Sequence, residues 1–436
     1  MMECDRSVEA KDFMTKHPSE NKPPICCRSA ALLLTLILVL CATNRWLSLE
    51  EGIRIENAVD TNYYMSIAES APSLPPADAQ LSFHHAQRFV LPYIVGTVAF
   101  YSHLSPQQVF RVAAIVLVVL NTCVAYRILC YLCIPWPYRT LCISLLILHP
   151  YMFRLYLAIP ALAVDLMFTF GLSLLVYGLL QGRLGTAVIA ALIATLGKQT
   201  SLFALPVTAI WILFGPSWGK YSLVRRIGSL LLIAAVCAVC YLATASVAKG
   251  FSQESIGAFA LLTGLPRWVL SGFNAGLLAN FLFRGIFPFL FPLCIGCAVL
   301  SRTRPPLPIE FYLLIAMVLA CCLQPLLGGP ITTGPDVLRL NLLAYAPLLA
   351  ALGLLLREAK LPGYSESLMV VCGSLIAIGS LHPRFTYNGS ASKGETGMSL
   401  MGTHESSPAV QFICLYCLSA FLLGVLIYLS ARPAKE

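Results

Sequence analysis

Charge is scarce in this chain. Acidic and basic residues make up 11% of its 436 residues, whereas 58% are hydrophobic and the mean hydropathy is +0.79. Soluble domains carry about 25% charged residues, so the composition excludes an ordinary soluble domain. The net charge of +9 needs no nucleic-acid partner, because more than half of the basic residues fall on one predicted side of the membrane. We therefore expect an all-α, polytopic integral membrane protein.

Internal repeats and low-complexity segments are also missing. Inverted repeats are typical of many transporters, and none is visible here. The 17 cysteines lie mostly inside apolar runs, where they behave as small apolar side chains. Their four CxxC pairs sit on different predicted helices without histidine in register, so no structural zinc site is expected. These pairs are Cys130/Cys133, Cys237/Cys240, Cys294/Cys297 and Cys414/Cys417.

The apolar runs predict about twelve transmembrane helices. Residues 1–29 form a polar tail with a composition typical of disorder. The run 88–101 is short for a span, so we expect an interfacial or re-entrant helix there, within a long first outer loop at 49–107; a true span is the alternative. The predicted spans are 30–48, 108–130, 139–153, 160–181, 185–198, 201–215, 228–248, 278–300, 309–325, 339–356, 366–381 and 409–430.

The distribution of basic residues predicts the orientation. With both termini in the cytoplasm, the inner segments collect most Lys and Arg, as the positive-inside rule requires. The outer side then carries polar residues that the topology does not explain. We divide the chain into the cytoplasmic tail at 1–29, a core module at 30–215 and a C-terminal transmembrane module at 216–436.

The stretch "ENAVDTNYYMSIAES" at 56–70 is the first unusual outer segment. Asp60, Tyr63, Tyr64 and Ile67 recur at helical spacing, so a helix would place a carboxylate and tyrosines on one stripe. This helix could hold the carboxylate over a cavity at the membrane surface. The alternative is structural: the tyrosines form an interfacial belt and Asp60 caps the helix.

Two further polar positions interrupt apolar runs. Asp165 lies about one turn inside the span 160–181, where a carboxylate requires a cavity or a partner such as Arg154. Lys198 and Gln199 break the run from Ala187 to Phe214. A lysine there either snorkels to the membrane surface or binds an anion.

Several basic and histidine side chains also fall on the predicted outer side. Arg339 opens a helix there, and His84, His85 and Arg88 stand in "FHHAQRFVLP". Each arginine alone could contact a lipid headgroup. Together they would form a cationic pocket suited to a phosphate, beside carboxylates that could deprotonate a hydroxyl nucleophile.

The sequence resembles the GT-C membrane glycosyltransferases that use polyprenyl-phosphate sugars. The likeness rests on an outer Asp-x-x-Tyr-Tyr after the first span, on "FHHAQRFVLPYIVG", and on "ALAVDLMFTFGLSLLVYGLLQGRLGTAVIAALIATLGKQTSLFALP". It covers residues 30–210 well and the remainder by layout only. Asp60 is not followed by Gly or Glu as in some relatives, and no WWD signature of oligosaccharyltransferases is present.

The resemblance implies an inverting transfer of a sugar from a polyprenyl-phosphate donor to a glycan, lipid or protein acceptor on the outer face. It implies catalytic roles for Asp60, as the base, and for Asp165, which matches the family's second outer acidic position. The substrate-binding residues would be Tyr63, Tyr64, His84, His85, Arg88, Lys198, Gln199 and Arg339. No cofactor is expected, and a divalent metal stays open.

Two other classes remain open. A lipid or glycan transporter would require charges at mid-depth and broken helices, and a non-catalytic assembly subunit would tolerate Asp60→Asn. The compartment expected is a bacterial inner membrane, or the ER membrane in a eukaryote.

Overall fold

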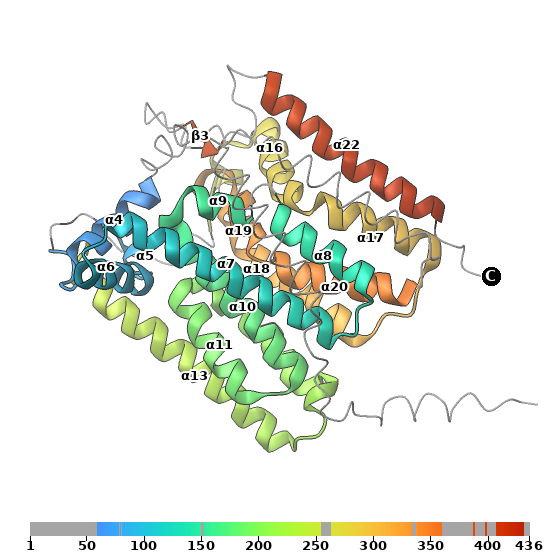
Figure 1. The fold of residues 1–436 in the computed structure, drawn as a ribbon, viewed down its shortest axis with the longest axis horizontal. Helices are drawn as coiled ribbons and strands as arrows, with labels where there is room; N and C mark the ends of the chain where they lie inside the picture. Colours follow the sequence, from blue (N-terminus) through green and yellow to red (C-terminus); the bar gives the residue numbers. More distant parts are fainter. Residues whose placement is uncertain are drawn as a thin grey trace, which may run out of the picture.

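The computed structural model describes residues 59–77, 79, 81–149, 152–253, 263–333, 337–359, 387–388, 397–398 and 407–430. The predicted tail at 1–29 and the predicted spans at 30–48 and 366–381 lie outside these residues. The described chain is helical almost throughout, as predicted (Figure 1).

The helices of the first half are α4 (Val59–Ser70), α5 (Phe83–Ala86), α6 (Val90–Ser102), α7 (Pro106–Tyr131), α8 (Trp136–Leu148), α9 (Phe153–Ala158), η1 (Pro160–Leu162), α10 (Ala163–Gln181), α11 (Leu184–Gly197), η2 (Gln199–Ala204) and α12 (Leu205–Phe214). Those of the second half are η3 (Pro216–Trp218), α13 (Leu223–Ala248), α15 (Gly264–Gly272), α16 (Ala275–Ile286), η4 (Phe287–Phe289), α17 (Leu290–Thr303), α18 (Ile309–Thr332), α19 (Val337–Leu342), α20 (Tyr345–Ala359) and α22 (Ser407–Ser430).

Six helical segments of the described chain are long and apolar enough to cross a bilayer, which is typical of a membrane protein. They are Pro106–Tyr131, Trp136–Leu157, Pro160–Gln181, Leu223–Ala248, Ala275–Thr303 and Ile309–Pro330. The count of about twelve spans therefore stays a prediction, and six of the predicted runs correspond to these segments.

Four further apolar helices of the described chain are shorter: Val90–Ser102, Leu184–Gly197, Gln199–Phe214 and Tyr416–Leu429. The predicted spans 185–198 and 201–215 are Leu184–Gly197 and Gln199–Phe214, each shorter than the roughly 20 residues of a typical transmembrane helix. The break falls at Lys198, whose backbone is extended (φ −162°, ψ 136°), as the predicted division near this residue requires. At 13 residues, α6 spans about 20 Å, less than the hydrocarbon thickness of about 30 Å.

Each half of the chain contains closely packed helix pairs. Helix α10 packs along α11 and against α7, while α22 packs along α17 at the opposite side (Figure 1). A Cβ on Gly171 of α10 would lie 2.4 Å from the backbone nitrogen of Ala194 in α11. Glycine is therefore required for this close approach, as in many membrane helix pairs.

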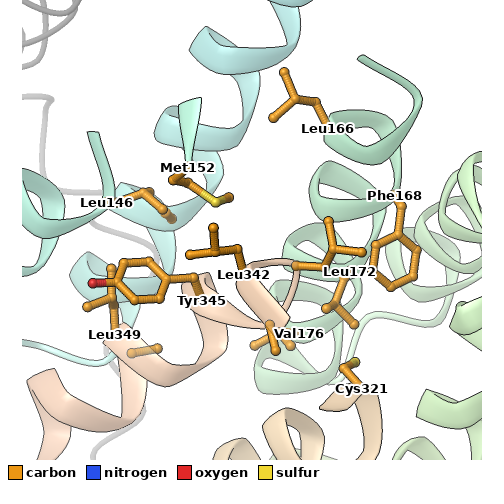
Figure 2. Packing of buried hydrophobic residues seen from close by; sticks show 14 of the residues in the cluster. Leu146, Met152, Leu166, Phe168, Leu172, Val176, Cys321, Leu342, Tyr345 and Leu349 are labelled. Atoms are coloured by element: carbon orange, nitrogen blue, oxygen red, sulfur yellow. The ribbon is translucent and has the colours of Figure 1, made fainter. Parts of the chain in front are cut away.

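The core fixes the position of α19, the short helix that carries Arg339. Leu342 is fully buried and lies centrally in the apolar group that also contains Met152 and Leu172 (Figure 2). Because Arg339 precedes Leu342 by three residues, the two side chains share one face of α19.

Two short strand pairs complete the described structure. Strand β1 (Leu81–Ser82) pairs in parallel with β2 (Ser252–Gln253), and β3 (Tyr387–Asn388) pairs antiparallel with β4 (Gly397–Met398). The first pair fixes the segment that leads directly into α5 and its two histidines.

Candidate active site

Helix α4 confirms the helix predicted from the spacing of Asp60, Tyr64 and Ile67. Tyr64 and Ile67 are buried, so this stripe faces the protein rather than forming an interfacial belt. Asp60 lies inside the first turn of the helix. Its side chain contacts His85 and Arg339, so it does not act as the cap that was the structural alternative.

His85 and Arg339 bind the two carboxylate oxygens of Asp60 separately. His85 Nε2 lies 2.9 Å from Oδ1, and Arg339 Nη2 lies 2.7 Å from Oδ2. Burial alone would raise the pKa of Asp60, but the charge of Arg339 and the hydrogen bond from His85 outweigh it and hold the pKa well below its usual range. Asp60 is therefore ionised at neutral pH.

The hydrogen bond to Asp60 determines the tautomer of His85. Burial lowers the pKa of His85, although Asp60 partly offsets this effect, so the ring is neutral at neutral pH. An ionised carboxylate only accepts hydrogen bonds, so Nε2 carries the hydrogen and Nδ1 keeps its lone pair. Nδ1 is buried and has no hydrogen-bond partner in the structure.

Asp165 forms a second carboxylate centre at the start of α10. Lys198 Nζ donates a 2.6 Å hydrogen bond to its Oδ1, and both side chains are almost completely buried. The partner of Asp165 is thus Lys198 rather than Arg154. Lys198 reaches Asp165 because Gly197 lets the end of α11 approach α10: a Cβ there would lie 2.6 Å from the backbone nitrogen of Phe168.

Arg339 connects the two carboxylate centres. While Nη2 binds Asp60, Nε lies 3.5 Å from Asp165 Oδ2, an ion-pair distance longer than a hydrogen bond. A guanidinium can do this because its donors diverge from one rigid plane. The predicted core module at 30–215 and the predicted C-terminal module therefore share one site.

Arg88 adds a third cation. Its Nε donates to Gln199 Oε1 at 3.2 Å and its Nη1 donates to the Tyr64 hydroxyl at 3.3 Å. It also interacts electrostatically with Asp165 and Asp60. Burial raises the pKa of Tyr64 to about 12, so this hydroxyl stays protonated beside the guanidinium.

The remaining predicted residues surround His85. The ring centroids of Tyr63 and His84 lie 4.8 Å and 3.9 Å from that of His85. His84 Nδ1 is 2.7 Å from Ser82 Oγ. Burial, followed by the neighbouring His85 and Arg88, lowers the pKa of His84 to about 2, so its ring is neutral. All ten predicted site residues thus lie in one connected group.

The electrostatic result is a group of cations and carboxylates gathered in one place. We call Asp60, Asp165, Arg88, Lys198 and Arg339 the charged cluster. Its three cations present several N–H donors within reach of the two carboxylates. Such donors are the groups that bind a phosphate, so this arrangement suits an anionic ligand.

Asn121 was missed by sequence reasoning. Its Nδ2 donates to Leu117 O within α7 and to Leu166 O of α10, so it ties α7 to the turn that carries Asp165. A lone amide inside the apolar run "IVLVVLNTCV" was the available signal. No group of three His, Cys, Asp or Glu residues that could hold a metal occurs in the part of the chain that the structure describes.

Comparisons with protein-family models, with curated proteins and with solved structures find no match to this chain.

Proposed function

We propose that this protein is a GT-C-type glycosyltransferase that moves a sugar from a polyprenyl-phosphate carrier to a glycan, lipid or protein acceptor on the outer face of the membrane. The observation that carries the proposal is the charged cluster. Two carboxylates and three cations from five separate segments converge in a helical protein with helices fit to cross a bilayer. Transfer of a sugar from a phosphate-linked donor requires cations for the leaving phosphate and a base for the acceptor hydroxyl.

The cations suit the phosphate of the donor. As the bond between the anomeric carbon and the phosphate oxygen breaks, negative charge grows on the leaving polyprenyl phosphate. Positive groups already held in place stabilise that charge with little reorganisation. Lys198 and Arg339 are fixed on Asp165, and Arg88 is fixed on Gln199 and Tyr64. Their N–H groups would donate hydrogen bonds to the phosphate oxygens.

The carboxylates suit the acceptor. In the proposed step, the acceptor hydroxyl oxygen attacks the anomeric carbon while the phosphate leaves from the opposite side, which inverts the configuration. The acceptor proton passes to the Asp60–His85 pair. The low pKa of Asp60 makes the isolated carboxylate a weak base, but it orients His85 so that Nδ1 can accept a proton. The imidazolium that forms is then stabilised by Asp60.

The first experiment compares wild type with Asp60→Asn in lipid nanodiscs. Both are incubated with a panel of polyprenyl-phosphate sugars and candidate acceptors, with and without a chelator, and released polyprenyl phosphate is measured. We expect release by wild type and at least a hundredfold loss in the variant, because an asparagine in this place would neither orient His85 nor stabilise its imidazolium, and general-base catalysis is typically worth about 10²–10⁴-fold. Glu310→Gln is the matched control, because Glu310 lies in the first turn of α18 and interacts with Tyr131, at the end of α7 remote from the site.

Two results would contradict the proposal. Equal release by wild type and Asp60→Asn would remove Asp60 from the chemistry. Absence of both release and donor binding across the panel would favour a transporter or an assembly subunit instead.

A further inference from the structure

A second site lies beside the charged cluster, on an adjoining face of α4. Helix α4, the start of α7 and the segment around η1 enclose a pocket of about 280 Å³. Thr61, Met65 and Glu69 line it at a spacing of four residues, so they form one stripe of α4. Asp60, Tyr64 and Ile67 form the stripe that faces the cluster. The pocket is therefore separate from the site described above, although Thr61 and Asp60 are neighbours in sequence.

The polar groups of the pocket differ in character from the charged cluster. Glu69 only accepts hydrogen bonds, Arg111 only donates them, and the amides of Asn62 and Gln107 do both. Among the lining residues that the structure describes, Glu69 is the one acid and Arg111 the one base, and their formal charges cancel. Such a lining suits a neutral ligand that carries donors and acceptors together, whereas the cluster suits an anion.

Thr61 provides an independent sign of a ligand. Its residue is 4% exposed, and its Oγ1 is buried without a hydrogen-bond partner in the structure. Buried hydroxyls are almost always satisfied, so an unsatisfied one calls for a partner. Thr61 lines the pocket, and a rotation about its χ1 would turn this hydroxyl from its covered position towards a ligand there.

Size and the apolar wall narrow the class of ligand. The pocket volume corresponds to roughly nine water molecules, which lies just below the range of about 300–1,000 Å³ typical of drug-sized ligands. Phe110 and Pro160 give the pocket an apolar side. A single sugar ring combines these requirements, because it has hydroxyls around its edge and C–H groups on its face.

We propose that this pocket binds one neutral saccharide unit through Thr61, Asn62, Glu69, Gln107 and Arg111. That the saccharide is part of the acceptor rests on the proposed function. The binding itself rests only on the pocket. On this assignment, α4 forms a wall shared by the two sites, with the donor phosphate on the Asp60 side and an acceptor sugar on the Glu69 side.

The test measures binding without requiring transfer. Purified protein in nanodiscs is titrated with methyl glycosides of neutral hexoses and N-acetylhexosamines, and binding is followed by saturation-transfer difference NMR. The variants are Thr61→Val, which removes only the hydroxyl, and Glu69→Gln. The control is Thr97→Val in α6, because the Thr97 hydroxyl bonds Tyr93 O within its own helix and does not line the pocket.

We expect at least one glycoside to bind wild type and the control equally, with at least a tenfold weaker affinity in Thr61→Val and Glu69→Gln. Binding that is unchanged in both variants would overturn the assignment, and so would the absence of binding across the glycoside panel. Saccharide binding without any sugar transfer by wild type would instead contradict the proposed function and leave the pocket assignment intact.

Discussion

Arg339 Nη2 lies 2.7 Å from Asp60 Oδ2, although 279 positions separate these residues in the chain. The same guanidinium reaches towards Asp165. One side chain of the C-terminal half thus holds the two carboxylates that the N-terminal half supplies. The stability of the cluster and its chemistry should therefore depend on the same residue.

Replacing Arg339 should damage both properties. Arg339→Ala leaves two buried carboxylates with one cation fewer, and breaking a buried ion pair costs about 3–5 kcal/mol in soluble proteins. We expect a lower Tm and a loss of sugar transfer. Arg339→Lys should also lose activity, because an ammonium cannot reproduce the diverging donors of a guanidinium. Arg267→Ala, at an exposed position of α15, is the control that should leave the Tm and activity unchanged, as measured by thermal unfolding and the release assay.

The effects of replacing Asp165 and Lys198 on the free energy of unfolding should not be additive, because the two side chains form a buried ion pair. Asp165→Asn and Lys198→Met each leave an unpaired buried group, so each should lower the Tm. The double variant removes both members and should recover part of the loss, with an interaction free energy of about 0.5–3 kcal/mol. A double-mutant cycle by thermal or denaturant unfolding measures this term. Simple additivity of the two losses would show that the 2.6 Å contact does not contribute to stability.

Two glycines offer a matched test of the packing of α10 on α11. A Cβ at Gly171 would meet the backbone of Ala194, whereas a Cβ at Gly185 has nothing within 4 Å. Gly171→Ala should cost about 1–3 kcal/mol, as is usual for overpacking. Gly185→Ala should be neutral or slightly stabilising, because alanine favours the helical conformation more than glycine does. Equal Tm values for the two variants would contradict the close approach of these helices.

Acid should destabilise the protein through His84. Its pKa is about 2 in the folded protein, against the ordinary 6.5, because of burial and the nearby His85 and Arg88. Between these values the unfolded chain binds more protons, so stability falls as the pH is lowered through this window. At pH 5 the loss from this group is at most about 2 kcal/mol. His84→Gln should therefore show a smaller decrease in Tm between pH 7 and pH 5 than wild type, and an identical decrease would exclude this contribution.

The helix at α4 and the division at Lys198 were predictable because both depend on local patterns. Spacing along α4 identified one stripe, and a single lysine in an apolar run identified the break. The number of spans stays a prediction. It depends on whether short apolar helices such as α11 and α12 cross the bilayer, and hydropathy alone does not decide this.

The sequence by itself determined the helical, membrane-protein character of this chain and the identity of its unusual polar residues, because hydropathy and the cost of intramembrane charge are properties of each segment. Tertiary structure decided the partners: Lys198 for Asp165, Arg339 for both carboxylates, and Gln199 and Tyr64 for Arg88. It also decided which face of α4 borders a pocket. These contacts join residues far apart in the chain, so they depend on how the helices pack, and no local pattern encodes that packing.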